Sequence, residues 1–114
     1  MRQAASRDVQ DIVFVGEQDG PPEQQLKERL AALFERHAGV SSAYLARAII
    51  DRRTTVILGV SAAGLDESDF AREVGAVFAA IFNRRAHLDI VFLSRDQRAA
   101  ISRVCRAFYD RDGQ

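Results

Sequence analysis

A chain of 114 residues has room for one domain built around one hydrophobic core, and we expect residues 11–110 to form it between a flexible tail (1–10) and a frayed end (111–114). The formal net charge is zero, so no long-range positive field would attract nucleic acid or an anionic membrane. Cys105 is the single cysteine, which excludes an internal disulfide and a cluster of thiolate metal ligands. The sequence shows neither a signal peptide nor a long apolar run, so we expect a cytoplasmic protein.

A strand and a helix open the domain. Residues 11–16 (DIVFVG) are rich in β-branched residues and predict a buried strand. Pro22 suits the first turn of a helix, and apolar residues then recur at i, i+4, i+7 and i+8. This stripe predicts a helix from about residue 22 to residue 37, which Gly39 ends.

A pair of strands follows. Residues 40–50 (VSSAYLARAII) carry the longest strand pattern in the chain, and residues 54–61 (TTVILGVS) predict the next strand. The turn between them, Asp51-Arg52-Arg53, is short enough for a hairpin, although it lacks the usual Asn-Gly signal.

A second helix and a fourth strand come next. The acidic cluster Asp66–Asp69 predicts a helix start, and an apolar stripe extends the helix over residues 67–84. Gly75 within it either weakens the helix slightly or lets a strand approach closely. Residues 87–94 (HLDIVFLS) predict the fourth strand.

A third helix closes the chain. Ser94 and Gln97 have the spacing of a capping box, in which each side chain satisfies a backbone N–H at the helix start. The apolar face of this helix is expected to consist of Ile101, Val104, Cys105 and Phe108.

The element order β-α-β-β-α-β-α predicts an α+β fold. Two β-α-β halves, echoed at a constant offset of apolar positions, favour a ferredoxin-like split β-α-β arrangement (βαββαβ) with an additional C-terminal helix. Its antiparallel sheet would have the strand order 4-1-3-2, with two helices on one face.

The second face of the sheet is also apolar. The fourth strand offers Leu88, Ile90 and Phe92 on one side and Val91 and Leu93 on the other, where a solvated face would carry polar residues. Something must therefore cover that face, and three candidates stay open: the last helix, a second subunit or another domain.

The segment VSSAYLA at residues 40–46 resembles a signature in the C-terminal domain of the bacterial enhanced serine sensitivity (SseB) proteins. Three neighbouring segments agree with that pattern: a strand followed by proline at residues 13–22, an LDIVFL strand at residues 88–93, and the closing pair Phe108-Tyr109. The resemblance spans roughly residues 11–110.

Two departures from this family pattern stand out. Its members usually carry a separate N-terminal domain, so the resemblance implies a stand-alone form or a fragment. Its closing motif is commonly Pro-Phe-Tyr, and Ala107 replaces the proline here. The family defines no reaction and supplies no catalytic residues, so the resemblance implies a non-enzymatic domain.

The first candidate site is a protein interface. Both sheet faces are partly apolar and no catalytic constellation is present, which favours a non-catalytic interaction module that forms a homodimer or binds another protein. The residues proposed for it are Tyr44, Arg47, Val91, Leu93 and Phe108. For Tyr44 the alternative is a core tyrosine whose hydroxyl bonds to the backbone.

The second candidate is a ligand site at the loop after the first strand and at the polar end of the second helix. Amide groups at a helix start and a cluster of basic residues can hold anionic groups, and analogy with amino-acid-sensing ferredoxin-like (ACT) domains makes an amino acid the alternative partner. Its residues are Gly16, Glu17, Asp19, Gly20, Arg84, Arg85 and His87.

Other chemistries find little support. Cys105 lies on the apolar stripe of the last helix, which is typical of an unreactive core thiol. The two histidines lack metal-binding spacing and no nucleotide-binding glycine motif occurs, so neither metal nor cofactor is expected. An RNA-binding sheet needs stacked aromatic residues and a basic surface, and this chain predicts neither.

Overall fold

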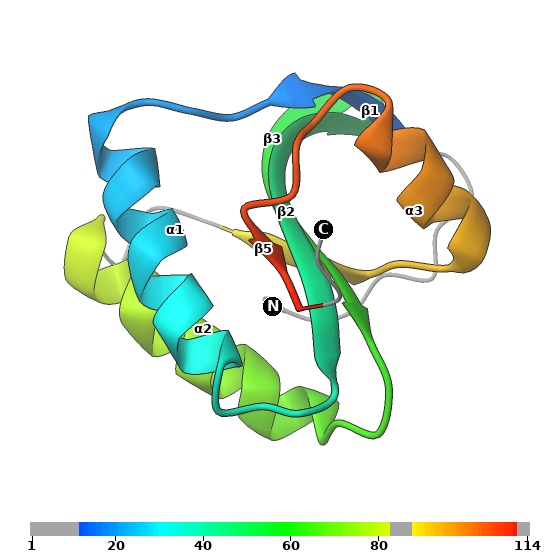
Figure 1. Cartoon of the computed structure of the whole chain (residues 1–114). Coiled ribbons are helices and arrows are strands. Elements are labelled where there is room, and N and C mark those ends of the chain that lie inside the picture. The colour runs from blue at the N-terminus through cyan, green and yellow to red at the C-terminus, as the bar shows by residue number, and fades with distance from the viewer. Residues whose placement is uncertain (1–11, 83–87, 112–114) are drawn as a thin grey trace.

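The computed structural model describes residues 12–82 and 88–111, which fold into two layers of helices with a sheet between them (Figure 1). The elements are β1 (Ile12–Glu17), α1 (Pro21–Phe34), β2 (Val40–Ile50), β3 (Arg53–Ala62), α2 (Glu67–Ile81), β4 (Asp89–Phe92), α3 (Arg95–Ser102) and β5 (Tyr109–Asp110). In Figure 1, α1 and α2 lie on the left of the sheet and α3 lies on the right. The predicted α+β class is confirmed.

The predicted strand order 4-1-3-2 is wrong. The sheet runs β1-β2-β3-β4, with β5 beside β2, and β3 pairs with β4 in parallel while the other pairs are antiparallel. Hydrophobic periodicity states which face of a strand is buried, but the same alternation is compatible with several neighbours. Here β1 pairs with β2 because Ile12 and Phe14 pack against the same core as the C-terminal half of β2.

β2 contributes to two hydrophobic cores at once. Ala43 and Leu45 are buried on the side of α1 and α2, whereas Tyr44, Ala46 and Ala48 are buried on the side of α3. A half-exposed strand alternates apolar and polar residues, and a strand covered on both faces does not. The run of small and apolar residues in β2 therefore follows from its position in the middle layer.

The first core joins α1 and α2 to the sheet through stacked aromatic rings. The ring of Phe34 lies 5.3 Å from that of Phe70 and 5.7 Å from that of Tyr109, centroid to centroid. The leucine stripe of α1, Leu26, Leu30 and Leu33, is buried in the same core, as its spacing predicts. Such rings bring large buried areas and favourable edge contacts to one point of the molecule.

The other face of the sheet is covered by α3, which forms the second core with it. Ile101 of α3 is fully buried against it, together with Val91 of β4 and Ile57 of β3. Gly59 of β3 permits this approach, because a Cβ there would lie only 3.1 Å from Cδ1 of Ile101. The helix is shorter than predicted and ends at Ser102, so Val104, Cys105 and Phe108 belong to the segment that follows it.

That closing segment returns along β2 and fastens the end of α1. The N–H of Phe108 donates to the carbonyl of Ala43 at 3.0 Å, and the N–H of Arg111 donates to that of Ser41 at 2.8 Å. The Arg111 guanidinium, expected in the frayed end, donates to the carbonyl oxygens of Phe34 at 2.9 Å and Val40 at 3.0 Å. The Phe34 carbonyl, which also accepts from the N–H of His37, lies at the end of α1, where a cation complements the helix dipole.

The predicted local signals are confirmed. Asp66 caps α2 by accepting from the N–H of Asp69, and Ser94 and Gln97 form the capping box of α3. The hairpin between β2 and β3 closes with Asp51 and Arg52 at φ of 52° and 68°. Two central residues with positive φ define the turn type that matches the twist of a β-hairpin, even without Asn-Gly.

Two glycines have opposite roles. A Cβ on Gly39 would collide with the carbonyl oxygen of Ala63, whose N–H already donates to the Gly39 carbonyl at 2.9 Å. Gly39 therefore permits a close backbone approach, whereas α1 itself ends earlier, at Phe34. A Cβ on Gly75 would meet nothing within 4 Å, so the suggested approach of a strand to Gly75 is wrong.

We expect Gly39→Ala to destabilise the domain and Gly75→Ala to stabilise it. The first forces backbone apart, at a cost on the order of 1–3 kcal/mol, and the second replaces a glycine inside a helix, a gain of about 0.5–1 kcal/mol. Urea unfolding of both variants beside the parent measures the two effects. If both substitutions changed the free energy of unfolding by the same amount and in the same direction, the roles given to Gly39 and Gly75 would be wrong.

Candidate functional site

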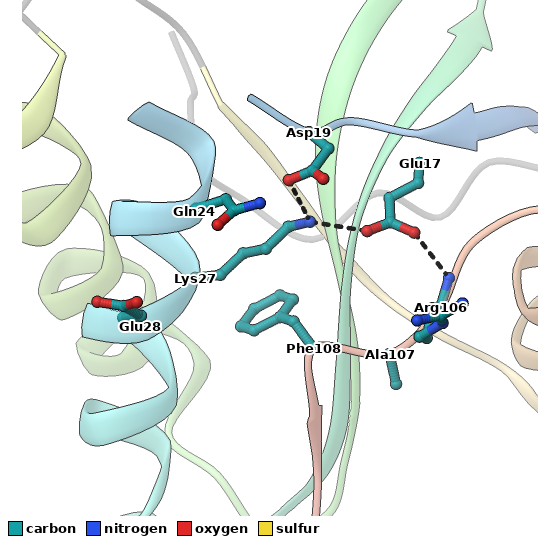
Figure 2. Close-up of a pocket in the computed structure, with 8 residues that line it drawn as sticks. All are labelled: Glu17, Asp19, Gln24, Lys27, Glu28, Arg106, Ala107 and Phe108. Atoms are coloured by element: carbon teal, nitrogen blue, oxygen red, sulfur yellow. Dashed lines mark hydrogen bonds and ion pairs between the residues drawn. The ribbon is translucent and has the colours of Figure 1, made fainter. Parts of the chain in front are cut away.

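A hollow of about 260 Å³ lies where β1 leads into α1 and the closing segment crosses them (Figure 2). The side chains around it come from three places in the sequence: the β1–α1 junction, the first two turns of α1, and residues 106–108. They are Glu17, Asp19, Gln24, Lys27, Glu28, Arg106, Ala107 and Phe108.

Lys27 is the centre of the charges in this hollow. Its Nζ donates to Oε2 of Glu17 at 2.9 Å and to Oδ1 of Asp19 at 3.2 Å (Figure 2). Partial burial alone would lower the pKa of Lys27, but the hydrogen bonds with Glu17 and Asp19 outweigh it and raise that pKa. The hydrogen bond from Lys27 in turn lowers the pKa of each carboxyl, so all three groups are charged at neutral pH.

Glu17 also links β1 to the closing segment. Its Oε1 accepts from the backbone N–H of Arg106 at 3.4 Å, while its Oε2 holds Lys27 of α1. One carboxylate thus fastens three segments that are far apart in the sequence. These contacts hold the fold together. Arg106 and Glu28 are the other charged residues that line the hollow.

Cys105 lies next to this hollow without contributing a reactive group. The thiol is buried, and its Sγ donates to the carbonyl of Leu45 at 3.3 Å. Burial, with a smaller effect of the Glu17 charge, raises the pKa of Cys105 to about 11. A thiol with so high a pKa holds almost no thiolate at neutral pH, and the thiolate is the nucleophile.

A second feature is an exposed apolar face, formed by Val13 and Val15 of β1 and Ile49 of β2. The exposed fractions of these side chains are 58%, 44% and 37%. Val13 and Ile49 are partners in the β1–β2 register. We call these three residues the valine face. It continues the side of the sheet that α1 and α2 cover elsewhere, because odd-numbered β2 residues, such as Leu45, point to that side.

A family model for the "SseB protein C-terminal domain" matches residues 11–111 of the 114 residues. The chain belongs to the SseB C-terminal domain family. Searches of curated proteins and of solved structures found no match. In this SseB domain the closing Phe108-Tyr109 pair has a visible role, because both rings pack against Phe34 and their backbone pairs with β2.

The five predicted interface residues are scattered over the domain. Tyr44 and Val91 are buried in the second core, and Leu93 packs against that core. Phe108 packs against the first core. Arg47 is exposed beside the valine face, where its Nη2 would lie 3.1 Å from a Cβ on Gly16.

The predicted ligand residues divide into two groups. Glu17 and Asp19 line the hollow, and Gly16 and Gly20 flank them in sequence. The three basic residues, Arg84, Arg85 and His87, lie outside the described residues.

Sequence reasoning missed both Lys27 and the valine face. Lys27 is the single lysine of the sequence and lies in the second turn of α1, within reach of Glu17 and Asp19. The sequence predicts a buried strand for this segment, whereas Val13 and Val15 are exposed. Residues 12–15 are all apolar, so the sequence does not show which of them face the core and which face solvent.

Across residues 12–82 and 88–111, no helix combines the length and hydropathy needed to span a bilayer. The same residues contain no group of three or more His, Cys, Asp or Glu side chains arranged to hold a metal ion.

Proposed function

We propose that this SseB domain is a non-catalytic interaction module, and that its partner at the valine face is a second copy of the chain. The observation that supports this is the gathering of exposed branched side chains at one edge of the sheet, Val13, Val15 and Ile49. Single exposed apolar residues are ordinary on protein surfaces, but neighbouring ones on a strand at a sheet edge favour association.

The size of this face predicts a weak dimer. Complete burial of a valine or isoleucine side chain contributes about 1.5–3 kcal/mol, and these three are already about half buried. If a dimer buried all six side chains completely, they would contribute at most roughly 5–9 kcal/mol at half that value. Association itself costs an estimated 4–15 kcal/mol. Because the two ranges overlap, a dimer formed at this face is weak, reversible and dependent on protein concentration.

We expect sedimentation velocity to show this dimer and to locate it. The double substitution Val13→Thr with Val15→Thr keeps the β-branched shape and removes apolar surface, so it should raise the dissociation constant at least about tenfold, the equivalent of 1.4 kcal/mol. Val104→Thr is the matched control: Val104 is also exposed, at 39%, and follows the helix on the opposite face. A parent protein that is monomeric at all concentrations, or a control that acts like the double variant, would overturn the proposal.

A second function, small-ligand sensing, has its own observation. The hollow at the β1–α1 junction, of about 260 Å³, is lined by three acidic residues and by Arg106. Groups of both signs suit a zwitterion, since an ammonium and a carboxylate can each find an opposite charge there. An amino acid is therefore the ligand class that we propose for this hollow.

We expect a thermal-shift screen against free amino acids to identify such a ligand. Binding to the folded state stabilises it by about 2.7 kcal/mol at a hundredfold excess over Kd. Arg106→Gln should abolish the shift for a responding compound, while Arg95→Gln, an exposed arginine of α3 outside this hollow, should leave it unchanged. A flat response of the parent protein to every amino acid at millimolar concentration would remove this second function.

A further inference from the structure

We infer that two copies of this domain meet edge to edge through β1, in antiparallel orientation about a two-fold axis that passes next to Phe14. This inference rests on the proposed dimer and adds its geometry. It makes the two sheets one continuous sheet and places the two valine faces side by side on the same side of it.

Among the described strands, β1 pairs with β2 alone, so its outer edge carries backbone groups with no partner strand there. In β2 the carbonyls of Ser41, Ala43 and Leu45 all accept bonds from the side where β5 and β1 lie, from the N–H groups of Arg111, Phe108 and Gln18. Residues of one parity in a strand direct their backbone groups to the same neighbour, so Ile49 also faces β1 and bonds with Val13.

The backbone N–H and C=O groups of the residues on either side of Val13 must then point away from β2. The N–H and C=O groups of Ile12 and Phe14 are directed outward, and no strand in the described part of the chain pairs with that edge. An open row of donors and acceptors is a template for another strand. The strand that offers the same row with the same spacing is β1 of a second copy.

A two-fold axis next to Phe14 makes the side chains self-complementary. Phe14 then lies opposite Phe14 of the second copy. Val13 of each copy lies opposite Val15 of the other copy. Because the Phe14 pair exchanges the hydrogen bonds, the valine pairs are of the closer, non-hydrogen-bonded kind. The bulge between Phe14 and Gly16 limits the paired run to a few residues, in keeping with a weak dimer.

Charge also favours the antiparallel orientation. One end of β1 carries Glu17, Asp19 and Lys27, with a net charge of −1. The other end lies beside the exposed turn Asp51-Arg52-Arg53, with a net charge of +1, because Ile12 pairs with Ile50. An antiparallel pair brings opposite ends together, and a two-fold contact closes on itself instead of growing into a fibre.

Disulfide trapping tests this register. Val13→Cys and Val15→Cys are made separately, one of them labelled with ¹⁵N, then mixed and oxidised mildly, and the disulfide-linked dimers are weighed by mass spectrometry. Residues opposite each other come within disulfide reach, whereas the diagonal pairs, 13 with 13 or 15 with 15, are about 7–8 Å apart. The buried thiol of Cys105 does not compete.

Random encounter gives mixed and same-variant disulfides in equal amounts, while the inferred register gives mixed disulfides almost exclusively. Preferred trapping of Val13→Cys with itself would place the axis at Val13 and overturn the register. A dimer seen by sedimentation without any preferred trapping would overturn edge pairing and leave the proposed dimer standing. A parent protein that is monomeric by sedimentation would overturn both.

Discussion

The fold depends on one constraint: β2 must be covered on both faces and paired on both edges. Its side chains alternate between two cores, and its backbone bonds to β3 on one side and to β1 and β5 on the other. A strand of eleven residues in this position leaves many buried polar groups to satisfy, and each unpaired one costs free energy. Ser42 shows the limit of this arrangement, since its buried hydroxyl has no hydrogen-bond partner within the described structure.

Most of the other elements cover β2 or pair with it. α1 and α2 cover one face and α3 the other, and after α3 the chain returns to pair with the part of β2 that β1 does not reach. Arg111 then donates to the carbonyl of Phe34 at the end of α1 and to that of Val40 at the start of β2, so this residue links the first helix to the sheet. The Glu17 carboxylate at the end of β1 also links distant segments, because it bonds to Lys27 of α1 and to the backbone N–H of Arg106 in the closing segment. The covered strand thus leaves β1 as an edge with apolar side chains.

The elements could be predicted from the sequence to a large extent, because their signals are local. The helix stripes, the Asp66 cap, the capping box at Ser94 and the bounds of β2 all depend on residues a few positions apart. The strand order could not be predicted, since alternation fixes a buried face and not a neighbour. The hollow and the valine face depend on that order: Arg106 meets Glu17 only because the chain returns after α3, and Val13 is exposed only because β1 lies at the edge.

Amide hydrogen exchange of β1 at several protein concentrations tests the interaction edge most directly. By the register of β1 and β2, the N–H of Val13 points to Ile49, whereas that of Phe14 points away from β2 and would bond to the second copy in the proposed dimer. We predict that exchange at Phe14 slows as protein concentration rises, while exchange at Val13 stays constant. Exchange at Phe14 that is fast at every concentration would contradict the interaction edge.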